Sequence, residues 1–126
     1  MKLRVFDNGI QSHNNKIQQS LKTDGIYIMH EEGYSYTVGF LKVGSPDLIL
    51  YDQTQGVAEE IFQLLFQAVQ LGLIQLRQDM MIEHVLEPQP RLIAVTELDK
   101  KQHFYAARTY YGDWNFSVLK IQLKLH

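Results

Sequence analysis

The sequence predicts an α+β fold, in which a mostly antiparallel sheet of five or six strands carries a long helix on one face and a second helix beside it. Short segments rich in β-branched and aromatic residues follow one another across tight turns, which is typical of antiparallel strands. Two longer segments, at about 54–71 and 98–111, space their apolar residues as helices do. Helices that fall between groups of strands favour α+β over a regular β-α-β pattern.

The strands are predicted from their alternation and from the turns that bound them. The clearest is Tyr34–Leu41, where large apolar residues alternate with small or polar ones, a period of two that marks one buried face. The next is Asp47–Tyr51, whose uninterrupted apolar run predicts a central strand. The last strand carries Lys120 and Lys124 on one face, which predicts an exposed edge. The other strands share a β-favouring composition: Ile26–His30, Met80–Leu86, Arg91–Thr96 and, as that last strand, Ser117–Leu125.

The long helix is predicted over Thr54–Leu71, and its first residue is a typical N-cap. Its apolar surface is broad because Phe62 and Phe66 widen the helical stripe, so we expect a sheet to cover it. Near the N-terminus the pattern predicts a weakly amphipathic helix over 10–21, preceded by a short strand or arm over 2–6.

A motif in two parts occupies the middle of the predicted sheet. It reads Tyr36-Thr37-Val38-Gly39-Phe40 and then Ser45-Pro46-Asp47-Leu48, directly before the long helix. This arrangement resembles an uncharacterised bacterial family, domain of unknown function 4262, whose members show Tyr-Thr-Val-Gly-Leu and then His- or Ser-Pro-Glu/Asp-Leu. The resemblance extends to Tyr110-Tyr111-Gly112 and Val118-Leu119 and so covers most of the chain. Phenylalanine stands where leucine is usual, and the acidic, tryptophan-rich ending of many relatives is missing. The resemblance implies no activity.

Composition places the chain among ordinary globular proteins. Its 126 residues suffice for a single domain, 1–126, and contents of 45% hydrophobic and 21% charged residues argue against disorder. A net charge of -2 with scattered Lys and Arg disfavours a nucleic-acid partner. The lack of cysteine excludes disulfides and thiolate chemistry. No apolar run has the length of a signal peptide or a membrane span, so we expect a cytoplasmic protein with no membrane contact.

Histidines are the first candidates for chemistry. The five histidines share no metal-ligand spacing, and no phosphate-binding loop is present, so we expect no metal and no cofactor. His30 and His84 lie on predicted strands beside glutamates, but adjacent strand residues point to opposite faces. A tertiary pairing of either histidine with a carboxylate such as Asp47 would suit a small hydrolase. A structural or surface role is the interpretation that we favour for each histidine.

The strand of the two-part motif is the second candidate. Ser35, Thr37 and Gly39 share one face and could line a small pocket with Glu31 or Asp47 at its rim. Tyr36 of the same motif is a further candidate ligand contact. The favoured alternative is that the glycine admits a phenylalanine of the long helix, because glycine in a strand marks close packing. No base is evident within sequence reach of the serine or threonine, so a Ser-His-Asp site has almost no support.

The third candidate is the aromatic segment between the second helix and the last strand. Tyr110 and Trp114 could stack on a planar ligand or anchor a partner chain. The favoured alternative is an apolar lid over the end of the core.

We therefore expect a non-enzymatic binding or protein-interaction domain whose partner is an unknown protein or small molecule. Self-association through an edge strand such as Ser117–Leu125 belongs to this hypothesis. The alternative is a small hydrolase-like enzyme, with a histidine–carboxylate pair in a cleft beside the Tyr-Thr-Val-Gly strand.

Overall fold

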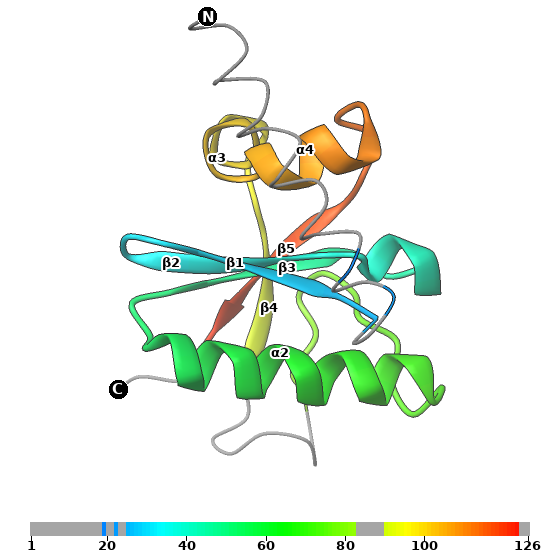
Figure 1. Ribbon diagram of the computed structural model, residues 1–126. Coiled ribbons are helices and arrows are strands. Elements are labelled where there is room, and N and C mark those ends of the chain that lie inside the picture. The colour runs from blue at the N-terminus through cyan, green and yellow to red at the C-terminus, as the bar shows by residue number, and fades with distance from the viewer. Residues whose placement is uncertain (1–18, 20–21, 23–24, 83–89, 124–126) are drawn as a thin grey trace, which may run out of the picture.

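The computed structural model describes residues 19, 22, 25–82 and 90–123 and confirms the α+β fold. Figure 1 shows three layers, with α2 on one face of the sheet and α3 and α4 on the other. Among the described residues, no helix is long and apolar enough to cross a membrane. The described elements are, in chain order, β1 (Tyr27–Glu31), β2 (Tyr34–Val38), the 3-10 helix η1 (Phe40–Val43), β3 (Asp47–Tyr51), α2 (Gln55–Gln70), β4 (Arg91–Ala94), α3 (Glu97–His103), α4 (Tyr105–Tyr111) and β5 (Val118–Gln122).

The sheet is mostly antiparallel, as predicted. Its strand order is β1-β2-β3-β5-β4, and the β3–β5 pair alone is parallel among the described strands. The parallel register sets Leu48 beside Leu119. A chain that runs from β3 to β5 must therefore cross from one end of the sheet to the other, and α2, β4, α3 and α4 all lie within that connection.

The prediction that Ser117–Leu125 forms an edge is wrong, because β5 lies between β3 and β4. Leu119 and Ile121 are buried on the side of α2. Lys120 is tolerated in this interior strand because its ammonium lies over the Tyr51 ring, 5.6 Å from the centroid, while its side chain stays partly exposed. Alternation of apolar residues with lysine thus marks a strand with one buried face, whether or not that strand is at an edge.

The outer side of β4 is paired with the segment that precedes it. Leu92 donates its N–H to the Met80 carbonyl at 2.9 Å, and Ile82 donates to the Pro90 carbonyl at 2.8 Å. Met81 forms a bridge with Arg91, so the described part of the predicted strand Met80–Leu86 does join the sheet. Residues 83–89, with the candidate His84, lie outside the described residues, as do the segments 2–6 and 10–18.

Helix α2 follows the prediction closely. Thr54 is the N-cap, and its Oγ1 accepts the Val57 N–H at 3.2 Å. The side chains of α2 that enter the core cover one face of the sheet and are Ala58, Ile61, Phe62, Leu65, Phe66 and Ala68.

The helix predicted over 98–111 is instead two short helices, α3 and α4, and they lie across the sheet from α2 rather than beside it (Figure 1). The break falls at Phe104, which leaves helical geometry with φ -104° and ψ 42° and is fully buried. Strand β3 explains the placement, because Leu48 and Leu50 face α2 while Ile49 faces the other core. A strand that is apolar on both faces needs a covering layer on each.

Gly25 provides a test of the packing against α2. Its φ is +85°, and an added Cβ would lie 2.5 Å from the Phe66 ring, which is held edge-on against Phe40 in the core. Gly33 has a similar φ of +88° with open space around it. We expect each alanine substitution to lower the free energy of unfolding by about 1 kcal/mol through backbone strain. Gly25→Ala should cost a further 1–3 kcal/mol or so through overpacking.

Urea unfolding of the two variants measures the difference, with Gly33→Ala as the matched control. Equal losses in both variants would contradict the close packing of Phe66 on Gly25.

Candidate functional site

The two parts of the sequence motif come together around the carboxylate of Asp47, which is 1% exposed. Thr37 donates its hydroxyl to Asp47 Oδ1 at 2.7 Å, and the Phe40 N–H donates to the same oxygen at 3.1 Å. The Tyr111 hydroxyl, from α4, donates to Oδ2 at 2.6 Å. One side chain therefore ties together β2, η1, β3 and α4. We call this group the Asp47 network.

Local sequence explains how the chain wraps around this carboxylate. Beyond Tyr36 the β2–β3 ladder stops, and the Thr37 hydroxyl accepts the Leu48 N–H at 3.0 Å in place of a backbone carbonyl. Gly39 then turns the chain with φ 121°, a value that favours glycine, and donates its N–H to the Tyr111 hydroxyl at 2.8 Å. The glycine therefore serves this turn. A phenylalanine of α2, Phe66, closely approaches a different glycine, Gly25.

Burial raises the pKa of Asp47 to about 7, against its ordinary value of 3.8. Hydrogen bonds from Tyr111, Thr37 and the Phe40 amide oppose this shift, because they stabilise the charged form. Burial and the nearby Asp47 charge also raise the pKa of the Tyr111 phenol. A carboxylate so enclosed changes charge near neutral pH but does not reach solvent, so its direct role is to hold segments together.

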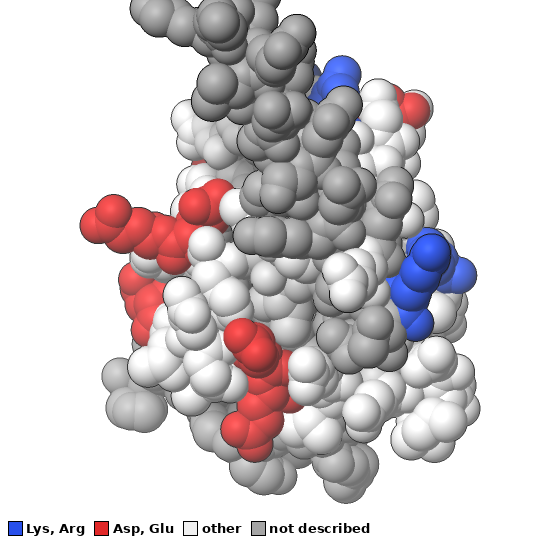
Figure 2. Space-filling view, viewed as in Figure 1, with Lys and Arg blue, Asp and Glu red and all other residues white. Residues whose placement is uncertain are grey.

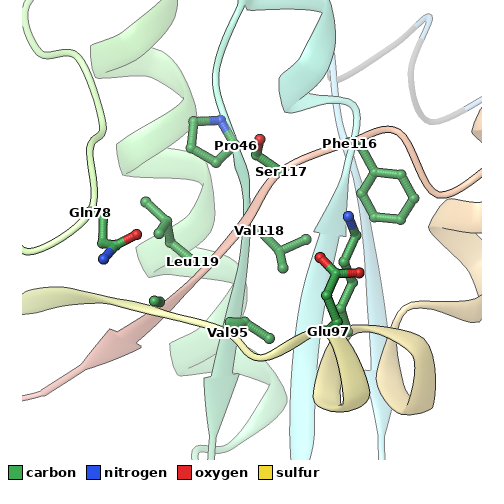
Figure 3. A pocket seen from close by; sticks show the side chains of 10 residues that line it. Pro46, Gln78, Val95, Glu97, Phe116, Ser117, Val118 and Leu119 are labelled. Atoms are coloured by element: carbon green, nitrogen blue, oxygen red, sulfur yellow. The ribbon is translucent and has the colours of Figure 1, made fainter.

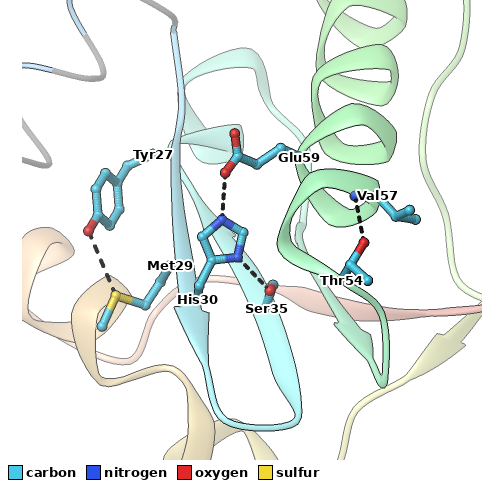
Figure 4. Close-up of polar contacts among 7 residues, drawn as sticks. All are labelled: Tyr27, Met29, His30, Ser35, Thr54, Val57 and Glu59. Atoms are coloured by element: carbon cyan, nitrogen blue, oxygen red, sulfur yellow. Dashed lines mark hydrogen bonds and ion pairs between the residues drawn. The ribbon is translucent and has the colours of Figure 1, made fainter.

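The second polar group links the β1–β2 hairpin to α2. His30 Nδ1 lies 2.8 Å from Ser35 Oγ, and His30 Nε2 lies 2.8 Å from Glu59 Oε2 (Figure 4). We expected no base within reach of Ser35, and this expectation is wrong. The hairpin register sets positions 30 and 35 opposite each other, so that pairing was open to inference, whereas Glu59 comes from 29 residues away in the sequence.

This Ser35–His30–Glu59 chain has the hydrogen-bonding order of a nucleophile, a base and an orienting carboxylate. The solvent exposure of the three side chains argues against a catalytic role. Ser35 is 4% exposed, while the His30 and Glu59 side chains are 17% and 49% exposed. The accessible end is thus the carboxylate, and the hydroxyl that would attack a substrate lies beneath the helix.

The residues predicted to contact a ligand lie in different environments in the structure. Tyr36 is 1% exposed and its hydroxyl accepts the Ala106 N–H at 3.0 Å, so it positions the start of α4. Thr37 belongs to the Asp47 network. Tyr110 and Trp114 remain partly exposed.

Trp114 borders a hollow that sequence reasoning did not find. Two adjoining lobes of about 340 and 470 Å³ lie between α3 and the start of β5. Figure 3 shows the first lobe, where Gln78 and Phe116 lie at opposite ends and the Glu97 side chain extends toward Phe116. We call the whole the Lys100 hollow, after one of the four residues that line both lobes: Glu97, Lys100, Phe116 and Ser117.

Lys100 is the unusual member of this hollow, because a lysine is rarely as buried as its 7% exposure. Its ammonium donates to the Trp114 carbonyl at 2.8 Å and lies 4.7 Å from the centroid of the Phe116 ring. An ammonium has three N–H donors. Within the described residues, the other two have no hydrogen-bonding partner among the side chains and carbonyls that line the hollow.

Metal chemistry has no evident site in the described part of the chain. No group of three or more His, Asp or Glu side chains within residues 19, 22, 25–82 and 90–123 could hold a metal ion. The charged groups that the structure does gather are the Asp47 network, the Ser35–His30–Glu59 chain and the Lys100 hollow.

Comparison with known proteins gives one match. A family model described as Domain of unknown function (DUF4262) matches residues 10–124, a span that includes all three polar groups. No curated protein and no solved structure matches the chain.

The Asp47 network predicts an unusual dependence of stability on pH. The native carboxyl keeps its proton up to about pH 7, whereas the unfolded one loses it near 3.8. Between these values the native state binds more protons, so the free energy of unfolding should fall as pH rises, by up to about 1.4 kcal/mol per pH unit. Asp47→Asn should flatten this slope in urea unfolding at pH 4 to 8.

Asp52→Asn is the matched control, because Asp52 is exposed at the end of β3. It should keep the wild-type slope. An unchanged slope in Asp47→Asn would show that another group causes the pH dependence.

Proposed function

This chain belongs to the DUF4262 family, and on that premise we propose that it is a non-enzymatic binding domain whose ligand occupies the Lys100 hollow. The observation that carries the proposal is Lys100, whose side chain is largely buried while its ammonium, with one hydrogen bond to protein and two uncommitted donors, lies at the wall of a hollow open to solvent. A buried charge is costly unless polar groups satisfy it. A ligand acceptor would supply what the described protein groups leave unmet.

The surroundings of this ammonium suit a ligand with an apolar or planar body. Phe116, Val118 and Leu119 are buried and form part of the lining. Trp114 is stacked on Phe116, with ring centroids 6.0 Å apart and ring planes inclined by 27°, and borders the second lobe. Aromatic rings beside a few placed polar groups are typical of small-molecule sites.

The size of the hollow favours a small molecule over a protein chain. Each lobe falls within the range of about 300–1,000 Å³ that is common for ligand pockets.

The proposal does not include nucleic acid as a ligand. On the face shown in Figure 2, acidic side chains gather toward the hairpin end of the sheet and over α2, and the basic ones lie apart from them. A basic stripe would be the expected signature of nucleic-acid binding.

The same proposal places the protein in the cytoplasm, following the expectation from the sequence. It no longer includes self-association through β5, because that strand has a neighbour on each side.

A second candidate function, ester or amide hydrolysis, rests on the Ser35–His30–Glu59 chain. In such a reaction Ser35 Oγ would bond to the substrate carbonyl carbon while His30 Nδ1 takes the hydroxyl proton. Glu59 would stabilise the resulting imidazolium through Nε2. His30 would then return the proton to the leaving group, and water would release the acyl group from Ser35. The burial of Ser35 makes this the weaker proposal.

The binding proposal predicts which backbone amide signals a bound ligand will shift. In ¹H–¹⁵N spectra recorded with a library of small polar and aromatic compounds, binders should shift the amides of 95–101 and 114–119. Ser117→Phe should abolish these shifts, because Ser117 lines both lobes and is exposed. Thr109→Phe, on the exposed side of α4, is the matched control and should leave them intact.

Shifts that survive Ser117→Phe, or a library that leaves the hollow unperturbed, would count against the Lys100 hollow as the binding site.

The hydrolase candidate has a separate test. A fluorophosphonate, which phosphonylates activated serines with loss of fluoride, should not label Ser35, because that residue is 4% exposed and lies beneath α2. Peptide mass spectrometry after incubation locates any label. Labelling of Ser35 that disappears in His30→Ala, but persists in the matched variant His103→Ala, would establish the hydrolase and overturn a purely non-enzymatic role.

A further inference from the structure

The Lys100 hollow holds charges of both signs, and this limits what it can bind. Glu97 and Lys100 both line both lobes and lie one turn apart on α3. Among the described residues, His30 and Glu59 form the single ion pair. Glu97 and Lys100 therefore form no ion pair with each other. A carboxylate and an ammonium thus face one hollow without neutralising each other directly.

This arrangement discriminates between ligand charges. In the part of the hollow that both lobes share, a simple anion would gain from Lys100 but be repelled by Glu97, and a simple cation would meet the reverse. Lys101 lines the second lobe alone and is exposed, so solvent screens its charge. A ligand that carries an ammonium next to a carboxylate complements both groups at once. Lys100 would donate its uncommitted N–H groups to the carboxylate, and Glu97 would accept from the ammonium.

The rest of the hollow specifies the remainder of the ligand. The floor of the first lobe includes the apolar residues Phe116, Val118 and Leu119, which are buried and present little surface, while most of the exposed lining of both lobes is polar. The second lobe adds Trp114 and the exposed Leu41. Within this polar surround, Leu41, Trp114 and Phe116 of the second lobe can contact an apolar or aromatic group attached to the charged end of the ligand.

From these contacts we propose that the hollow binds a free α-amino acid with an apolar or aromatic side chain. The inference rests on the proposed binding function and makes it specific. Lys100 and Glu97 recognise the two charges that every free amino acid carries, and the Phe116–Trp114 wall selects the side chain.

A ligand series tests this with the wild-type protein. Titrations with L-phenylalanine, 3-phenylpropionate and phenethylamine, followed by ¹H–¹⁵N spectra, compare the whole zwitterion with molecules that lack one charge. L-phenylalanine should shift the amides of 95–101 and 114–119 and bind at least about tenfold more tightly than either analogue. Equal or tighter binding of one analogue would overturn the amino-acid inference while leaving the binding function standing. Failure of all three, when the compound library does perturb the hollow, would overturn it likewise.

Variants supply an independent measurement. Lys100→Met, which keeps most of the stem, and Glu97→Gln, which keeps the shape, should each weaken L-phenylalanine binding about tenfold or more. Matched controls are Lys42→Met and Glu60→Gln, both exposed and neither lining the hollow. Circular dichroism confirms that each variant is folded. Full affinity for L-phenylalanine in folded Glu97→Gln would refute recognition of the ligand's ammonium by Glu97. If Lys100→Met fails to fold, the analogue series tests recognition of the ligand's carboxylate.

Discussion

The buried carboxylate of Asp47 is the interaction on which the described architecture depends. Its oxygens accept from the Thr37 hydroxyl, the Phe40 amide and the Tyr111 hydroxyl, and these donors come from three separate elements. A short chain of donors therefore replaces the backbone ladder where β2 and β3 diverge. Because the group is almost fully enclosed, loss of the Tyr111 hydroxyl would leave the buried Oδ2 without its hydrogen-bond donor.

The same interaction fixes the wall of the hollow indirectly. Tyr111 anchors the end of α4 to the carboxylate, and the Tyr36 hydroxyl holds its first turn. At the other side, the Lys100 ammonium joins α3 to the Trp114 carbonyl. The segment between α4 and β5 is therefore held where it leaves α4 and again at Trp114, two residues before Phe116, which lines the hollow.

Sequence patterns predicted the individual strands and helices better than their arrangement or the polar groups that they bring together. The period of two in Tyr34–Val38 and the helical stripe around Phe62 are local signals, and both elements are present. The place of β5 inside the sheet depends on which strands it pairs with, and the alternation of its residues does not specify those strands. Nor does the alternation show that Lys120 lies over a tyrosine ring. His30 could be matched to Ser35 by hairpin register, but Glu59 and Lys100 acquire their roles through contacts across the fold.

The parallel pairing of β3 with β5 has a consequence for the order of folding. Leu48 and Leu119 are neighbours in the sheet although 71 positions separate them (119 minus 48). The β1–β2 hairpin closes over a two-residue turn and can form in microseconds, whereas the central pairing must first close a long loop. During synthesis β3 therefore leaves the ribosome before its partner exists. One side of that strand stays unpaired until β5 has been translated, so during this interval it needs protection from other nascent chains.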